Sequence, residues 1–281
     1  KASNMVVKSY SKINLSLIVN SKQKSGLHEI QSLYCLINLF DEINIIKTSK
    51  EDKIIFKGPF KKSLKKGNNT VLSLLKKLRK LNLISNYYSV TIKKKIPVFS
   101  GLGGGTSNAA FVLRHLLKTR VKEKLLNELA SIIGSDLKLF FKKQGFLKNL
   151  KTVIELKKNH KFYFLLIQPK FKCSTKEIYS KVKSFSKKKS VNINMFKNKD
   201  KYLDYLSKSK NDLQLIVERK YPILKRLLMD LKNEHGCQIS RMTGSGSVCY
   251  GLFRDKIVAK NALNKLKRTY PKFWFSLAKT V

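Results

Sequence analysis

A cluster of glycines before residue 110 has the residue types and the spacing of a phosphate-binding loop. The stretch reads Pro97-Val98-Phe99-Ser100-Gly101-Leu102-Gly103-Gly104-Gly105-Thr106-Ser107-Asn108-Ala109-Ala110. The alternating residues 87–92 predict a strand before it, and the Ala- and Leu-rich residues 109–117 predict a helix after it. Such a turn presents unpaired backbone N–H groups, and glycines let an oxyanion come close. We therefore favour phosphate binding over a plain connecting loop, with Thr106 or Ser107 as the helix cap or as a hydroxyl for a phosphate or its metal.

This loop is neither of the two commonest phosphate motifs, because it lacks the Gly-Lys-Ser/Thr ending of Walker A and the acidic residue of a dinucleotide site. It resembles the second motif of the GHMP superfamily of small-molecule kinases, named for galactokinase, homoserine kinase, mevalonate kinase and phosphomevalonate kinase. Within that superfamily, the triple glycine followed by Thr-Ser-Asn-Ala-Ala is similar to kinases that phosphorylate a cytidine-diphosphate sugar alcohol in the non-mevalonate route to isoprenoids. The resemblance implies ATP and Mg²⁺ as cofactors, with Ser107 as a candidate metal ligand. It also implies an ATP site formed by Pro97, Gly101, Leu102, Gly103, Gly104, Gly105, Thr106 and Ser107.

Two residues outside the loop are candidates for the chemical step. Ser11-Lys12-Ile13-Asn14-Leu15 resembles the family's first motif, Ala-Lys-Ile/Leu-Asn-Leu; on composition alone Lys12 would be one surface lysine among many. Gly134-Ser135-Asp136-Leu137-Lys138 resembles the family's Gly-Ala/Ser-Asp-Val-Pro segment, although Lys138 replaces the proline, and Asp136 alone could equally cap a helix. The resemblance implies that Asp136 takes or orients the acceptor proton, while Lys12 keeps that carboxylate ionised and offsets developing charge.

Three further segments are expected to bind the acceptor, whose 2-hydroxyl is the implied site of phosphorylation. Ser25-Gly26-Leu27-His28 resembles the family's Asp-Gly-Tyr-His turn, in which the tyrosine stacks on cytosine and the histidine bonds to its edge. Leu27 replaces the tyrosine, so we expect Tyr179, an aromatic residue on a short helix, to carry more of the stacking. Met242-Thr243-Gly244-Ser245-Gly246 resembles the family's third motif, although alone it would indicate only a hairpin turn. The predicted substrate-binding residues are Asn14, Leu27, His28, Tyr179, Thr243 and Gly244.

The composition sets limits on the class of protein and raises a second hypothesis. A length of 281 residues with 42% hydrophobic residues allows two domains with cores, and the four separated cysteines and four histidines show no metal-ligand spacing. The net charge of +43 would attract nucleic acid, but only eight of the 60 basic residues are arginine and the lysines are scattered. We therefore expect a cytoplasmic protein with a small-molecule substrate, no specific nucleic acid, no membrane segment, and a monomeric or homodimeric state.

The elements that must position these residues indicate an α+β chain. Predicted strands precede and follow Lys12, a helix capped by Asn68 or Asn69 runs to Leu83, and strands 33–39 and 42–48 are joined by a turn at Phe40-Asp41. The order strand, helix, strand, strand, helix, strand in the second half is typical of a ferredoxin-like layer, and the lysine-rich residues 183–201 suggest a surface loop. The resemblance implies the two-domain GHMP-kinase architecture. Its N-terminal domain (1–155) is ribosomal-protein-S5-like and carries the glycine loop, and its C-terminal domain (156–281) is ferredoxin-like.

Three alternatives remain at this point. A homoserine or mevalonate type of kinase shares the motifs, although the triple glycine and the Gly-x-His turn count against it. A basic nucleic-acid-binding protein would explain the charge but not the glycine loop. An inactive kinase homologue would be consistent with the departures at Leu27 and Lys138.

Overall fold

The computed structural model describes residues 6–63, 69–118 and 121–281, and the chain within it divides into two compact units. Unit 1 comprises Lys1–Ser11, Leu39–Val98 and Gly103–Lys142, and unit 2 comprises Lys12–Asn38, Phe99–Leu102 and Lys143–Val281. The predicted boundary at residues 155 and 156 does not coincide with this division, because β-strands near the N-terminus group with the second half of the chain. Asn68, one of the two predicted helix caps, lies outside the described residues.

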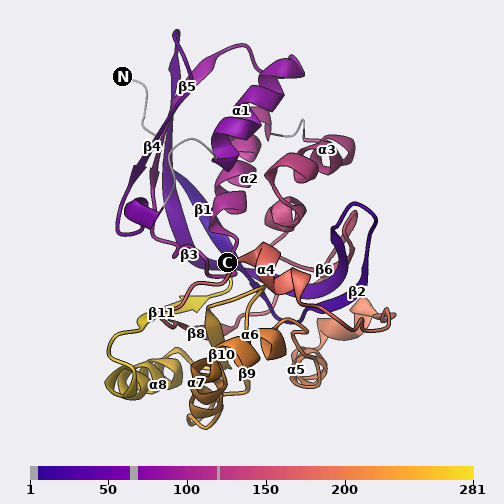
Figure 1. Cartoon of the computed structure of the whole chain (residues 1–281), viewed down its shortest axis with the longest axis vertical. Helices are drawn as coiled ribbons and strands as arrows, with labels where there is room; N and C mark the ends of the chain where they lie inside the picture. Colours follow the sequence, from indigo (N-terminus) through magenta and orange to yellow (C-terminus); the bar gives the residue numbers. More distant parts are fainter. Residues whose placement is uncertain (1–5, 64–68, 119–120) are drawn as a thin grey trace. The chain divides into compact units, whose positions relative to one another are not determined.

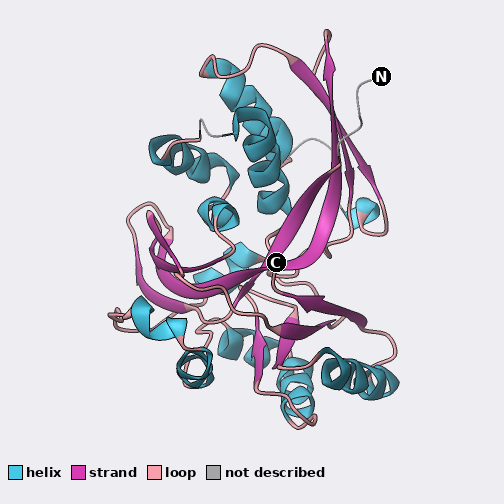
Figure 2. Ribbon diagram, turned by 180° about the vertical axis from the view of Figure 1, so that it is seen from behind, coloured by secondary structure: helices cyan, strands magenta, loops and turns pink. Residues whose placement is uncertain are grey.

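Unit 1 is a layer of strands with helices packed beside it (Figures 1 and 2). Its elements are β4 (Lys53–Lys57), η1 (Lys61–Ser63), α1 (Thr70–Lys80), β5 (Tyr87–Lys93), α2 (Gly104–Leu117), α3 (Glu123–Ile133) and η3 (Ser135–Phe141), together with parts of β1 (Val7–Asn14) and β3 (His28–Thr48). Strand β5 pairs parallel with β4 and antiparallel with residues 42–48 of β3. The apolar stripe of α1, predicted from its helical spacing, is buried at Val71, Leu74, Leu75 and Leu78.

Unit 2 contains a four-stranded antiparallel sheet in the order β11-β8-β10-β9, which is that of a ferredoxin-like layer. Helices α7 and α8 pack on this sheet. A second group of strands pairs β2 and β6 with the first part of β3, and β7 with β6. The elements of unit 2 are β2 (Ile18–Lys22), β6 (Gln144–Asn149), β7 (Thr152–Glu155), β8 (Tyr163–Gln168), α4 (Thr175–Ser180), η4 (Ile193–Lys197), α5 (Lys199–Ser207), α6 (Gln214–Lys220), α7 (Pro222–Lys232), β9 (Ile239–Met242), β10 (Cys249–Phe253), α8 (Lys256–Thr269) and β11 (Trp274–Lys279).

Two expectations about local structure were wrong. Phe40-Asp41 is not a turn between two strands, since β3 runs without a break from His28 to Thr48 and the Asp41 side chain is fully buried. Residues 183–201 are not only a surface loop, because they include η4 and the start of α5, and Phe196 is buried. In both cases a tertiary contact decides the local structure, and the composition of the segment alone does not reveal that contact.

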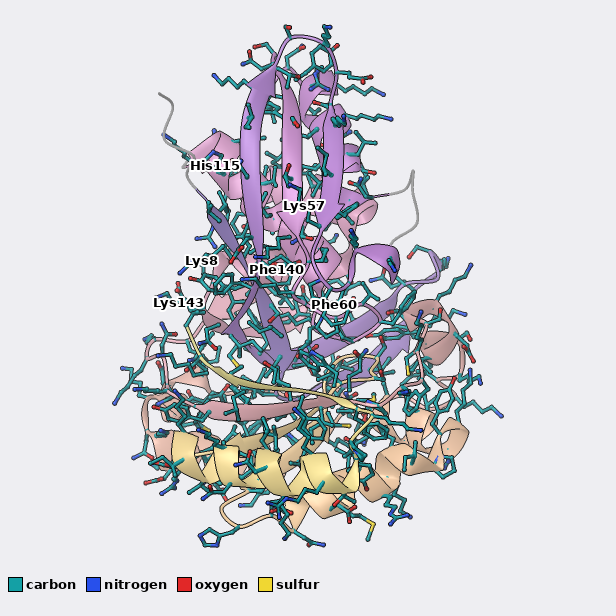
Figure 3. All side chains as sticks on the ribbon, turned by 90° about the vertical axis from the view of Figure 1, so that its left-hand side faces the viewer. Lys8, Lys57, Phe60, His115, Phe140 and Lys143 are labelled. Carbon is teal, nitrogen blue, oxygen red and sulfur yellow. The ribbon has the colours of Figure 1, made fainter. Side chains whose placement is uncertain are left out.

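The lysines are spread over the surface, as the sequence suggested. Lys8 on β1, Lys57 on β4 and Lys143 before β6 are all exposed, whereas Phe140 on η3 is fully buried (Figure 3). Within the described residues, no helix is long and apolar enough to cross a membrane.

Candidate active site

The glycine loop ends at the start of helix α2, in unit 1. The helix begins at Gly104, and its N-cap is Gly103, which has a left-handed backbone (φ 73°) and makes no side-chain cap hydrogen bond. The predicted caps Thr106 and Ser107 are therefore wrong in that role, because both lie inside the first turn of the helix. An N-terminus without a capping side chain keeps its backbone N–H groups available for an anion.

Side chains of unit 1 fix this helix start from two sides. Thr70 Oγ1, at the first residue of α1, donates to the carbonyl oxygen of Gly105 over 2.7 Å. Ser107 is fully buried, its hydroxyl oxygen lies 2.7 Å from Ser9 Oγ, and it donates to the carbonyl oxygen of Tyr10. The hydroxyl of Ser107 thus contacts strand β1, and its role as a metal ligand stays a prediction.

A buried charged network lies directly beneath the same helix start. Lys94 Nζ donates to Asp41 Oδ2 and, over 3.0 Å, to Asn108 Oδ1, while Asn108 Nδ2 donates to Asp41 Oδ2 over 2.9 Å. The other carboxylate oxygen, Asp41 Oδ1, accepts the backbone N–H groups of Lys95 and Ile96 at 2.7 and 2.9 Å. A Cβ atom on Gly104 would stand 3.4 Å from Lys94 Nζ, which places the ammonium next to the loop. Sequence analysis missed Asp41 and Lys94; an acidic residue inside an apolar strand was the available signal.

Asp136 lies beside the phosphate loop within unit 1. It occupies the first turn of η3, is half-buried, and follows Gly134, whose backbone has φ 142°. A Cβ atom on Gly134 would stand only 3.1 Å from Thr106 Oγ1, so the segment that carries Asp136 touches the first turn of α2. The structure therefore places the segment that carries Asp136 next to the predicted phosphate loop, and the role of Asp136 as a base stays a prediction.

Lys12 is not a surface lysine, because only 2% of the residue is exposed. In unit 2 its Nζ donates to Asn14 Oδ1 and, over 2.9 Å, to the carbonyl oxygen of Gly101. Asn14 Nδ2 donates to Ser32 Oγ over 2.9 Å, which fixes the orientation of the amide. Lys12 and Asp136 belong to different units, so their pairing stays a prediction.

The second glycine turn of the site, Thr243–Ser247, packs against residues 99–102 of the glycine loop within unit 2. Thr243 Oγ1 accepts the backbone N–H of Asn14 over 2.9 Å, and Ser247 N donates to the carbonyl oxygen of Phe99 over 3.0 Å. Gly101 has φ 77°, and a Cβ atom there would stand 2.1 Å from the carbonyl oxygen of Thr243, so only glycine fits. The tight turn that the sequence predicted at Thr243 and Gly244 is present, and it lies beside Lys12 and Asn14.

An aromatic cluster in unit 2 surrounds the predicted cytosine turn. The His28 ring lies 5.1 Å from Tyr179 and 6.4 Å from Phe185, measured between ring centroids. Leu27 is 51% exposed and Phe185 is 47% exposed, so both offer apolar surface to a ligand. Burial, with the charge of Lys22, lowers the pKa of His28, which keeps its ring neutral at pH 7. Sequence analysis missed Phe185, since it stands in a lysine-rich segment without periodicity.

The remaining predicted residues support these groups by packing. Pro97 and Leu102, two members of the loop, are buried. Lys138, which replaces the proline of the family motif, is also buried. In the part of the chain that the structure describes, no group of three or more His, Cys, Asp or Glu side chains could hold a metal ion.

Two family models and several known proteins match this chain. Residues 69–139 match the family model for the GHMP kinases N terminal domain, and residues 187–272 match the model for GHMP kinases C terminal. The chain is 38% identical, over 98% of each chain, to the 4-diphosphocytidyl-2-C-methyl-D-erythritol kinase of Pelagibacter ubique (strain HTCC1062). It is 30% identical, over 95% of each chain, to the enzyme of the same name from Ehrlichia chaffeensis (strain ATCC CRL-10679 / Arkansas). A crystal structure of 4-(cytidine 5'-diphospho)-2C-methyl-D-erythritol kinase matches 98% of this chain and 99% of its own, with a TM-score of 0.73 and 22% identity.

Proposed function

Because the chain belongs to the GHMP kinases, and within them to the 4-diphosphocytidyl-2-C-methyl-D-erythritol kinases, we propose that it phosphorylates the 2-hydroxyl of this cytidine-diphosphate sugar alcohol with ATP. The chain is thus an ATP-dependent small-molecule kinase of isoprenoid biosynthesis, and the expected two-domain α+β architecture is confirmed. The 38% identity over nearly the whole of both chains carries the proposal. It disfavours the homoserine, mevalonate and nucleic-acid alternatives.

The helix start at Gly103 to Thr106 would hold the phosphates of ATP. Its backbone N–H groups have no capping side chain, and they lie at the positive end of the helix dipole, so the loop suits an anion. Since the described residues hold no carboxylate cluster for a metal, we expect Mg²⁺ to enter with the phosphates of ATP and to neutralise part of their charge.

Asp136 and Lys12 would carry out the chemical step. The acceptor oxygen forms a bond to the γ-phosphorus of ATP, the bond from that phosphorus to the β,γ-bridging oxygen breaks, and ADP leaves. Asp136 accepts the proton of the acceptor hydroxyl, and the Lys12 ammonium, already ordered by Asn14 and Gly101, stabilises negative charge nearby. Their positions beside the two glycine turns support these roles.

The aromatic cluster would bind the cytosine of the acceptor. The neutral His28 ring offers both a donor and an acceptor nitrogen for the base edge, and Tyr179 and Phe185 offer flat faces next to it. Leu27 excludes water at the edge of this site but provides no ring. Phe185 thus supplies a second ring in a chain that lacks the family's tyrosine at position 27.

A coupled assay of ADP release tests the proposal directly. The protein is incubated with ATP, Mg²⁺ and one acceptor from a panel of the cytidine-diphosphate sugar alcohol, homoserine and mevalonate. We expect turnover with the first acceptor alone. Turnover with homoserine or mevalonate only would reassign the substrate, and no turnover with any acceptor would favour an inactive homologue. We further propose a cytoplasmic enzyme that works as a monomer or homodimer.

A further inference from the structure

Asn211 and Asp212 are adjacent residues before helix α6 that the mechanism above does not use. Asn211 is 5% exposed, and its Nδ2 donates to the carbonyl oxygens of Met242 and Gly244, both over 2.8 Å. Its Oδ1 accepts the backbone N–H of Leu213 over 2.9 Å. All hydrogen-bonding atoms of the Asn211 amide group are thus engaged, and two of these bonds fix the glycine turn that borders Lys12 and Asn14.

Asp212 contacts a different part of unit 2. Its Oδ2 accepts the backbone N–H of Val19 over 2.8 Å and the hydroxyl of Ser186 over 2.7 Å. Ser186 N also donates to the carbonyl oxygen of Val19 over 2.8 Å. Because Ser186 directly follows Phe185, these bonds fix the backbone that carries Phe185 relative to strand β2, which leads to His28.

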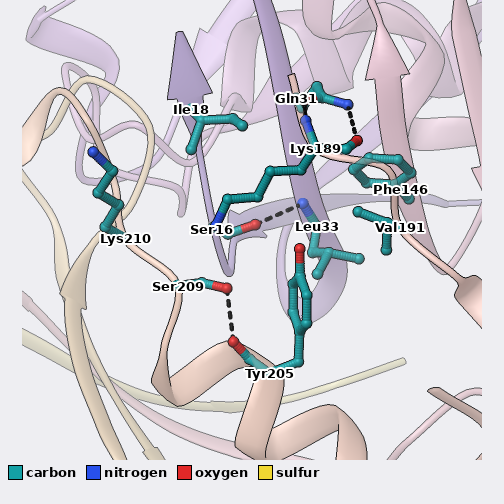
Figure 4. A pocket seen from close by; sticks show the side chains of 10 residues that line it. All are labelled: Ser16, Ile18, Gln31, Leu33, Phe146, Lys189, Val191, Tyr205, Ser209 and Lys210. Carbon is teal, nitrogen blue, oxygen red and sulfur yellow. Dashed lines mark hydrogen bonds between the residues drawn. The ribbon is translucent and has the colours of Figure 1, made fainter. Parts of the chain in front are cut away.

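A second anchor holds the same loop three residues further on. Lys189 N donates to Gln31 Oε1 over 2.8 Å, and Gln31 Nε2 donates back to the carbonyl oxygen of Lys189 over 3.0 Å. Figure 4 shows this pair at the rim of a pocket that Tyr205 and Lys210 also line. The loop between these two anchors therefore lies along strands β2 and β3, with Phe185 just before the first anchor.

We propose that Asn211 and Asp212 are positioning residues with separate roles in phosphoryl transfer and in acceptor binding. This inference rests on the function proposed above. Asn211 holds the Thr243–Gly244 turn beside Lys12, and so it affects phosphoryl transfer. Asp212 holds Phe185 opposite His28, and so it affects binding of the pyrimidine. Neither side chain contacts the reacting atoms, and each acts through the segment that it fixes.

Each of the two side chains has the hydrogen-bonding groups that its role requires. Two backbone carbonyl oxygens need a donor, which the amide of Asn211 supplies without burying a charge. A backbone N–H and a hydroxyl need an acceptor, which the carboxylate of Asp212 supplies, while Lys210 Nζ pairs with its other oxygen at 2.9 Å. Truncating either side chain to alanine removes these bonds without burying a new charge.

Steady-state kinetics of three variants test the proposal. Asn211→Ala loses both donated bonds and buries no charge, and we expect kcat to fall about tenfold with the KM for the acceptor within about twofold. Asp212→Ala should raise the KM for the acceptor about tenfold with kcat within about twofold, and Ser186→Ala should raise it about threefold. The KM for ATP should change little in the last two variants.

Matched controls separate positioning from a general loss of structure. Asn198→Ala changes the asparagine that caps helix α5 in unit 2, and Asp204→Asn changes an exposed carboxylate that pairs with Lys208, so both should keep wild-type constants. Calorimetric titration with CDP provides a readout besides turnover: Ser186→Ala should weaken CDP binding about threefold, and Asn211→Ala should leave it unchanged.

The outcomes distinguish the two proposals of this work. An inactive wild type with every acceptor would overturn the proposed function together with this inference. An active wild type would overturn the inference alone if Asn211→Ala and Asp212→Ala changed the same kinetic constant, or if Ser186→Ala left CDP binding unchanged. If Asp212→Ala fails to fold, as judged by its thermal transition, Ser186→Ala tests the claim that Asp212 positions Phe185 for binding of the pyrimidine.

Discussion

The two glycine turns of the site are held in place by different kinds of interaction. In unit 1, the start of α2 rests on the fully buried Asp41 carboxylate, the buried Lys94 ammonium and Asn108. In unit 2, the Thr243–Ser247 turn is held by single side-chain bonds to backbone groups, chiefly from Asn211. The flanking Arg241 also bonds to backbone groups, the carbonyl oxygens of Leu15, Leu206 and Ser209, but its donated bonds carry a positive charge.

This difference predicts which measured property changes when a contact of each turn is removed. A buried ion pair leaves an unpaired charge when one partner is removed, so damage at the turn in unit 1 should appear as lost stability. A neutral hydrogen bond contributes only about 0.5–1.5 kcal/mol net, so damage at the turn in unit 2 should leave the fold intact and appear in the kinetic constants. Substitutions in the two regions test this difference.

The largest effect is expected where both regions supply a group for the chemistry. Asp136→Asn in unit 1 and Lys12→Ala in unit 2 should each lower kcat by about 10²–10⁴-fold, the usual range for an acid–base role. Initial rates of ADP release at saturating ATP and acceptor measure this, with circular dichroism as the check on folding. A near-wild-type kcat in either variant would show that the substituted residue takes no part in the chemical step.

The buried pair of unit 1 gives the largest expected loss of stability. Lys94→Met should lower the free energy of unfolding by about 3–5 kcal/mol, because it leaves the Asp41 carboxylate buried without its cation. Urea denaturation followed by circular dichroism measures this change. The double variant Asp41→Asn/Lys94→Met should be more stable than Lys94→Met alone, and Asp204→Asn, in an exposed pair, should cost less than about 1 kcal/mol. A Lys94→Met protein as stable as the wild type would remove the contrast between the two turns.

Sequence reasoning succeeded where a short segment contains its own signal. The position of the glycine loop between a strand and a helix, the Thr243–Gly244 turn and the apolar stripe of α1 could be predicted, since each depends on a pattern within a short stretch of the sequence. The same holds for the order strand, helix, strand, strand, helix, strand in the second half of the chain. Asp41, Asn211 and Phe185 could not, because their partners lie far away in the chain. Asp41 bonds to Asn108, Asn211 to Gly244, and Phe185 lies next to His28. Long-range contacts of this kind leave no periodic signal in a single sequence.

An intermediate effect is expected in the aromatic cluster, which belongs to unit 2 and has no buried ion pair. Tyr179→Ala and Phe185→Ala should each weaken acceptor binding by about 1–3 kcal/mol, the range for loss of a side chain that stacks on a base. The KM for ATP should stay nearly constant, since neither ring lies at a glycine turn. The measurement is the KM for the acceptor and the KM for ATP of each variant, compared as a ratio. A rise in the KM for ATP alone would show that the pyrimidine has been placed in the wrong part of the site.

The smallest effect concerns Leu27, where the chain departs from its family. Leu27 is about half exposed beside His28, so a larger side chain can extend into solvent without disturbing the core. Leu27→Tyr should restore a ring next to the pyrimidine and tighten acceptor binding by about 0.5–1.5 kcal/mol, the value of a well-placed aromatic pair. Calorimetric titration with CDP measures the gain, and Leu27→Met, which adds length but no ring, is the matched control. The gain should shrink in a Phe185→Ala background if the two rings enclose the same base, whereas an unchanged gain would mean that Phe185 and residue 27 contact different parts of the ligand. Since no buried charge is involved, the free energy of unfolding should stay within about 0.5 kcal/mol of the wild type.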